Sequence, residues 1–321
     1  MSQGVPTLIT VDAVDAAGRA VLTPVQRKML DELIEPPGPR PVFDDLLPLR
    51  LVDRLEAGIA PVVDDMGPGA LAVNKSALAR VHQCERFFVV ENEARFEWSV
   101  AAARGTIAHR ALGLSLTMRD VPPLDLVDEA MARIADDGDD WTPRRFLRSA
   151  STGELAELRA SAGELVAKFQ ECCPPLRTDW RPRIESPLRV ELCADRVVLR
   201  AKIDLALHRA CGNEARTVLV DFKSGRPHAG HLDDLRFYAL VETIRLGVPP
   251  FRLAAYYLDA ARWQHEDVTE ELLEVAARRV VAGVRKLAEL RYGNREPEFT
   301  PSAACTYCRA RDTCPGPNLR Q

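Results

Sequence analysis

The order of hydrophobic and polar positions changes its period along the 321 residues of the chain. In the first half apolar residues recur with helical spacing, which predicts helices at residues 76–90, 101–117 and 153–172. In the second half alternation predicts strands at 184–192, 196–207, 216–223 and 251–258, with further helices at 231–246 and 268–290. This order predicts an α/β fold with a mixed central sheet flanked by helices.

Residues 1–70 differ from the remainder because prolines and glycines interrupt them and only short amphipathic helical stretches occur. We expect them to form an N-terminal extension or helical cap, and residues 71–321 to form one domain that carries the chemistry. We expect a solvated loop at the acidic residues 136–140. The chain shows neither a signal-peptide pattern nor an apolar run of membrane-spanning length, so we expect a cytoplasmic protein without a membrane partner.

Strand alternation places several charged side chains on one side of the predicted sheet. In the second strand Arg200, Lys202 and Asp204 lie opposite the apolar face, and in the third strand Asp221 and Lys223 do the same. At about 3.3 Å per residue, the last two lie roughly 7 Å apart along their strand. Neighbouring strands can therefore present two acids and a lysine on one shared polar face.

This set of side chains suits the hydrolysis of phosphodiesters. Asp204 and Asp221 can hold a divalent cation such as Mg²⁺, which lowers the pKa of bound water. Lys223 can orient that water and offset charge on the phosphate. His109, on the second predicted helix, can add a ligand that favours Mn²⁺. Each residue alone is more often a surface or structural group, and only their combination points to a site.

The eight cysteines of the chain divide into two groups. Cys305, Cys308 and Cys314 are closely spaced near the C-terminus, and Cys84 is a distant candidate for a fourth ligand. Four thiolates suit a tetrahedral soft-metal centre, and their spacing alone fits zinc as well as iron–sulfur. The other four lack such spacing, and we expect them to be packing residues: Cys172, Cys173, Cys193 and Cys211.

The formal net charge of −4 gives no global sign of a nucleic-acid-binding protein. A surface for nucleic acid must therefore be local, and residues 278–320 are the most basic candidate. A solvated basic helix and tail is an equally simple explanation of the same residues.

Three motifs in order carry a family resemblance. Gly105-Thr-Ile-Ala-His109, Ala201-Lys-Ile-Asp204 and Val220-Asp-Phe-Lys-Ser-Gly225 together resemble the PD-(D/E)XK nuclease superfamily, in its RecB-like branch. The cysteine arrangement is similar to that of the iron–sulfur subset, which includes CRISPR-associated exonucleases and the nuclease domain of AddB.

The resemblance implies a restriction-endonuclease-like fold and a metal-dependent DNA exonuclease, acting on single-stranded ends with CRISPR or recombination proteins as partners. It assigns the Mg²⁺ or Mn²⁺ ligands to His109, Asp204, Asp221 and the carbonyl of Phe222, and the role of catalytic lysine to Lys223. It further implies a structural [4Fe–4S] cluster that staples the chain ends, held by Cys84, Cys305, Cys308 and Cys314.

The chain departs from the family pattern at three places. Glu85 stands where a proline usually follows the first cysteine, and Ala201-Lys202 replaces the usual glycine and arginine before the second acid. Asp234-Leu-Arg-Phe-Tyr238 stands in place of Gln-x-x-x-Tyr. Tyr238 and Arg236 are expected to contact DNA, whereas the acid repels phosphate unless it binds metal or pairs with the arginine. A non-catalytic DNA-binding or adaptor subunit is therefore the alternative function, and an electron carrier is a third.

Overall fold

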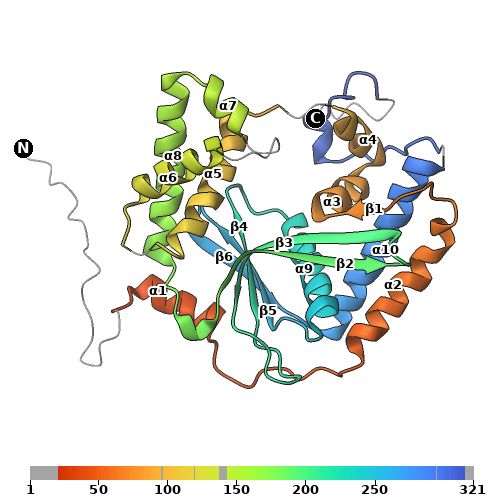
Figure 1. The fold of residues 1–321 in the computed structure, drawn as a ribbon, viewed down its shortest axis with the longest axis horizontal. Helices are drawn as coiled ribbons and strands as arrows, with labels where there is room; N and C mark the ends of the chain where they lie inside the picture. Colours follow the sequence, from red (N-terminus) through yellow and green to blue (C-terminus); the bar gives the residue numbers. More distant parts are fainter. Residues whose placement is uncertain (1–20, 95–96, 119, 137–142, 294, 315–321) are drawn as a thin grey trace, which may run out of the picture.

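The computed structural model describes residues 21–94, 97–118, 120–136, 143–293 and 295–314. Within these ranges a six-stranded mixed sheet stands between layers of helices (Figure 1). The strands are β1 (Leu71–Val73), β2 (Arg183–Leu192), β3 (Val197–Leu207), β4 (Val218–Lys223), β5 (Arg252–Tyr257) and β6 (Arg262–Asp267). The α-helices are α1 (Pro24–Met29), α2 (Leu47–Val63), α3 (Lys75–Gln83), α4 (Glu85–Glu93), α5 (Val100–Ser115), α6 (Pro123–Asp136), α7 (Arg144–Ser149), α8 (Thr152–Cys172), α9 (Gly230–Leu246) and α10 (Glu270–Tyr292).

The pairing of β3 creates a break in the sheet that positions the site. β2 pairs antiparallel along nearly all of one edge of β3. On the other edge β1 pairs in parallel with residues 197–199, and β4 pairs antiparallel with residues 205–207. Residues 200–204 of that edge lie between the two strands, and we call this break the sheet notch. β4 continues beside β5 as far as Lys223, so Asp221 and Lys223 lie where β4 has left β3.

The predicted α/β class and mixed sheet are confirmed, and most predicted elements agree within a few residues. Local signals fix several ends: the side chain of Thr269 caps α10, and Ser151 forms a capping box with Glu154 at the start of α8. Gly247 ends α9 with a φ of 85°, a conformation that favours glycine.

The prediction of one helix over residues 76–90 is wrong. Cys84 has extended backbone angles (φ −170°, ψ 125°), so it ends α3 and begins α4. The short β1 and the largely exposed β6 were not predicted, because one has three residues and the other lacks alternation of apolar side chains. Of the predicted acidic loop, Asp136 ends α6, and the next residues lie outside the described ranges.

The region before residue 70 contains a longer helix than the pattern indicated. α2 packs along α10, and its Leu47, Leu51, Leu55 and Ile59 are fully buried in the main core. The division of the chain at residue 70 stays a prediction. In the portion of the chain that the structure describes, no helix combines the length and apolarity required to cross a bilayer.

Candidate active site at the sheet notch

The predicted catalytic residues gather at the sheet notch from three elements. Asp204 lies in the notch on β3, Asp221 and Lys223 follow on β4, and His109 reaches the notch from α5. The sequence predicted that Asp221 and Lys223 lie on an open polar face of β4. This prediction is wrong for β4, because both faces of the strand are covered and Asp221 is only 1% exposed. α9 covers this face, since its Asp234 contacts Lys223.

Asp221 is a buried carboxylate between two ammonium groups. Its Oδ2 lies 2.8 Å from Lys223 Nζ, and its Oδ1 accepts a hydrogen bond from Lys75 Nζ at 3.0 Å. Burial alone raises the pKa of Asp221, but the charges of Lys75 and Lys223 outweigh burial and lower it. Asp221 is therefore held as an anion.

Asp204 and His109 form the second half of the site. Asp204 Oδ2 accepts a 2.8 Å hydrogen bond from the backbone N–H of Phe222, and His109 Nδ1 lies 3.5 Å from the same oxygen. Burial lowers the pKa of His109, but the hydrogen bond and charge of Asp204 outweigh it, so the pKa is raised. The ring of Phe222 packs edge-on against the imidazole, with ring centroids 6.2 Å apart. These contacts hold the carboxylate and the imidazole together.

The chemistry of these donors suits a divalent cation. Carboxylate oxygens and an imidazole are ligands that Mg²⁺ and Mn²⁺ accept, and Asp204, Asp221 and His109 could hold such an ion. Asp221 Oδ2 is buried and, among the described residues, receives no hydrogen bond of normal geometry, although Lys223 Nζ lies 2.8 Å from it. Within the same residues no three His, Cys, Asp or Glu side chains stand as a finished metal site. Both oxygens of Asp221 face ammonium groups instead.

Pairing of Asp234 with Arg236 was one of the possibilities that the sequence offered, but the partner of Asp234 in the structure is Lys223. Asp234 Oδ2 accepts a 3.1 Å hydrogen bond from Lys223 Nζ, so Lys223 lies between Asp221 and Asp234. Tyr238 is buried, and Lys75 Nζ lies 4.8 Å from the centre of its ring. The acid in the helix motif thus neutralises the predicted catalytic lysine.

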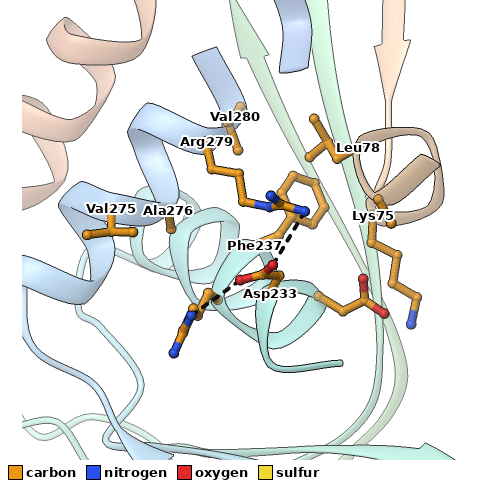
Figure 2. Close-up of a pocket in the computed structure, with 11 residues that line it drawn as sticks. Lys75, Leu78, Asp233, Phe237, Val275, Ala276, Arg279 and Val280 are labelled. Carbon is orange, nitrogen blue, oxygen red and sulfur yellow. Dashed lines mark hydrogen bonds and ion pairs between the residues drawn. The ribbon is translucent and has the colours of Figure 1, made fainter. Parts of the chain in front are cut away.

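A pocket opens beside Lys75, between α3, α9 and α10 (Figure 2). Asp233 lies in this pocket with two arginines, Arg236 at 3.3 Å and Arg279 at 3.4 Å. Arg236 also donates two hydrogen bonds of 2.8 Å to Glu266. The arginine expected to contact DNA is therefore neutralised by acids of the same chain.

The C-terminal segment folds back onto the start of α4, where Cys84 lies. The Sγ of Cys84 accepts backbone N–H groups from Phe87 at 3.5 Å and from Thr300 at 3.4 Å. Cys84, Phe87 and Ala304 form a small apolar cluster apart from the main core, and Cys308 packs against it. Residues 300–308 therefore contact the segment around Cys84, which lies more than 200 positions earlier in the chain.

The remaining cysteines have varied surroundings. Cys305 Sγ accepts the backbone N–H of Ser302 at 3.4 Å, and Cys314 is half-buried. Of the four expected packing residues, Cys172 and Cys173 are buried and Cys193 is half-buried, as expected. Cys211 is exposed, so its assignment to packing is wrong.

Two residues of this region escaped sequence reasoning. Lys75 contacts Asp221 although 146 positions separate them, and no local pattern distinguishes it from a surface lysine. Glu85, noted only as a missing proline, is 3% exposed and pairs with Lys286 and Arg295. The signal available in the sequence was an acid directly after a candidate cysteine ligand, where a proline is usual.

The strands of a mixed sheet thus part beside two acids, a histidine and a lysine, a set of side chains that suits the hydrolysis of phosphodiesters. The model of the PD-(D/E)XK nuclease superfamily matches residues 72–315, and the chain belongs to this superfamily. Enzymes of this superfamily generally use divalent metals such as Mg²⁺ or Mn²⁺.

Two solved structures are similar to the chain at low identity. A candidate exonuclease from Eubacterium rectale is 13% identical, with a TM-score of 0.45 over 75% of this chain and 88% of that one. The protein SSO0001 is 14% identical, with a TM-score of 0.35 over 83% of this chain and 94% of that one. A search of curated proteins gave no match.

Proposed function

We propose that this chain is a metal-dependent DNA exonuclease that acts on single-stranded ends, in DNA repair and recombination or in CRISPR spacer acquisition. The observation that supports it best is the meeting of Asp204, Asp221, His109 and Lys223 at the sheet notch. A bound Mg²⁺ or Mn²⁺ would polarise the phosphoryl group and supply an activated water.

The chain's own residues have distinct roles in this proposal. Asp204 and Asp221 supply negative charge to hold the cation, with His109 and the carbonyl of Phe222 as further ligands. Lys223, whose ammonium lies 2.8 Å from Asp221, orients the attacking water and offsets charge on the phosphate. Burial of this pair limits competition from bulk water and strengthens each charge interaction.

The test incubates end-labelled single- and double-stranded DNA with Mn²⁺ and compares the wild type with Asp221→Ala and Lys223→Ala. We expect both variants to lose at least about a hundredfold in rate, the order of magnitude typical for removal of one group that stabilises transition-state charge. Lys28→Ala is the control, since this exposed lysine lies on α1, outside the sheet notch, and pairs with Glu32 one turn away. Circular single-stranded DNA separates exonuclease from endonuclease action. Activity that survives both site substitutions would contradict the proposal.

A second candidate is a non-catalytic DNA-binding or adaptor subunit. It is favoured by the contact of Lys223 with two carboxylates, Asp221 and Asp234, which neutralises the ammonium that catalysis needs. In this case the wild type binds single-stranded DNA without cleaving it. Asp234→Gln would then leave the chain inactive, whereas an exonuclease retains or gains activity.

We further propose that Cys84, Cys305, Cys308 and Cys314 hold a [4Fe–4S] cluster. Backbone N–H groups directed at two of the sulfurs, and the packing of Cys308 beside Cys84, support a thiolate centre at this place. Iron, sulfide and zinc analysis of anaerobically purified protein distinguishes a cluster from zinc. A cluster gives brown protein with broad visible absorption, and zinc gives colourless protein.

A further inference from the structure

Lys75 reaches the buried acid of the site from outside the family motifs. It is the first residue of α3, which starts two positions after β1 ends and is capped by the side chain of Asn74. Because β1 and β4 approach β3 from opposite ends, the start of α3 and the end of β4 face each other across the sheet notch. The Lys75 ammonium thereby reaches Asp221 Oδ1 at 3.0 Å.

The site is close to charge balance as it stands. Three carboxylates, those of Asp204, Asp221 and Asp234, share the region with the ammonium groups of Lys75 and Lys223. Lys75 also lies over the face of the Tyr238 ring, a position that favours a cation. A divalent ion that binds at Asp221 therefore meets a fixed positive charge already in contact with that carboxylate.

We propose that Lys75 is the resident counter-ion of Asp221 and that a divalent metal binds there only when the ammonium of Lys75 moves away. This inference rests on the proposed metal-dependent function and adds a residue that sets its metal affinity. Lys75 keeps the buried carboxylate paired in the absence of metal, because a buried charge without a partner is costly. Because the ammonium of Lys75 occupies Asp221 Oδ1, the same contact lowers the affinity of Asp221 for metal.

The structure offers a place for the displaced side chain. Lys75 stands at the rim of the pocket between α3, α9 and α10, with its ammonium directed away from the pocket in Figure 2. Asp233 and Asp234 both line this pocket. Asp233 is already paired with Arg236 and Arg279, whereas Asp234 pairs only with Lys223 among the described residues. Rotation about the flexible side chain of Lys75 can therefore bring its ammonium from Asp221 towards Asp234, and Asp221 becomes free to bind metal.

The test measures Mn²⁺ affinity by calorimetry in the wild type and in Lys75→Met, Lys75→Arg and Lys28→Met. A charge within about 4–6 Å shifts the pKa of a carboxylate by about one to three units. Removal of the ammonium should therefore tighten Mn²⁺ binding by about tenfold or more. Lys75→Arg keeps the charge and should stay near the wild-type affinity, as should Lys28→Met, whose lysine is exposed on α1. Binding by Lys75→Met that is unchanged or weaker overturns the inference.

A second measurement uses the wild type alone and does not depend on how a variant folds. Amine labelling followed by mass spectrometry compares the reactivity of Lys75 with and without Mn²⁺, and the exposed Lys28 of α1 serves as the internal reference. Release from Asp221 should raise labelling of Lys75 severalfold and leave Lys28 unchanged. Equal labelling of Lys75 at saturating Mn²⁺ contradicts displacement and leaves the exonuclease proposal intact. Absence of Mn²⁺ binding in both wild type and Lys75→Met refutes the metal site itself, and with it both proposals.

Discussion

Glu85 allows a quantitative test of how the C-terminal segment is held. It begins α4 and is 3% exposed, and its carboxylate has three partners from the end of the chain. Oε2 accepts the backbone N–H of Glu298 at 3.0 Å and lies 2.8 Å from Arg295, and Oε1 lies 3.2 Å from Lys286. Glu85→Ala removes all three contacts at once.

The cost of this substitution can be estimated from the exposure of the partners. A hydrogen bond to a charged group contributes about 1.5–3 kcal/mol, and this value applies to the Glu298 N–H. Arg295 and Lys286 are about one-third exposed, so each ion pair contributes only about 0.2–1 kcal/mol after screening by solvent. We therefore expect Glu85→Ala to lower the free energy of unfolding by about 2–5 kcal/mol. Glu85→Gln keeps an acceptor for the backbone N–H and should cost about half as much.

The contribution of Glu85 should depend on pH with a definite sign. Burial raises the pKa of Glu85, but Arg295, the Glu298 N–H and Lys286 outweigh burial and lower it. A carboxyl whose folded-state pKa is lowered stabilises the fold above its ordinary pKa and loses that effect as pH falls through the folded-state pKa. The difference between wild type and Glu85→Gln should therefore be full at neutral pH and shrink in acid.

Urea unfolding at neutral and acidic pH checks these values. Glu129→Ala is the matched control, because this helical glutamate is exposed and pairs with Arg133 one turn away, which is worth about 0.3–0.5 kcal/mol. If Glu85→Ala costs no more than Glu129→Ala at neutral pH, the assignment of Glu85 as a buried anchor is refuted.

Two further predictions concern the support of the site. A Cβ on Gly283 of α10 would lie 2.4 Å from Leu78 of α3, so Gly283→Ala should cost about 1–3 kcal/mol in urea unfolding. Gly153→Ala, where the added Cβ meets nothing closer than 3.9 Å, should be neutral or stabilise by up to about 1 kcal/mol; equal effects would contradict the close packing of α3 on α10. Cys308→Ala should lower the iron content and the melting temperature, since metal binding and folding are coupled, whereas the exposed Cys211→Ala should change neither. Unchanged iron in Cys308→Ala would remove that residue from the proposed ligands.

Most of the sheet and its covering helices could be predicted because their signals are local. The alternation in β3 survives in the structure, where Arg200 and Lys202 are exposed between buried neighbours. The helix break at Cys84 could not be predicted, because apolar spacing runs through it. Its Sγ caps α4 through the N–H of Phe87 and also accepts the N–H of Thr300, a contact from far along the chain. β6 was missed for a related reason, since pairing with β5 rather than burial of alternate side chains makes it a strand.

The sequence identified the acids of the site, but it did not predict which residues and elements surround them. Strand parity correctly placed Asp221 and Lys223 on the same face of β4, but it carries no information on what covers that face. The cover is α9, whose Asp234 lies against Lys223. The contact of Lys75 with Asp221 depends on the order of β1, β3 and β4 in the sheet. Such information is tertiary and cannot be derived from one strand.

The pairing of β3 explains why cations must gather at this place. Asp221 lies where β4 parts from β3. Helix α9 covers this part of the strand, and only 1% of the surface of Asp221 is exposed. An anion buried there needs positive charge nearby, because isolated burial costs far more than the fold can supply. Lys223 alone does not balance Asp221, since Asp234 shares its ammonium. In the structure the second cation is Lys75, 3.0 Å from Asp221, and under the proposed function a metal at Asp221 would compete with it.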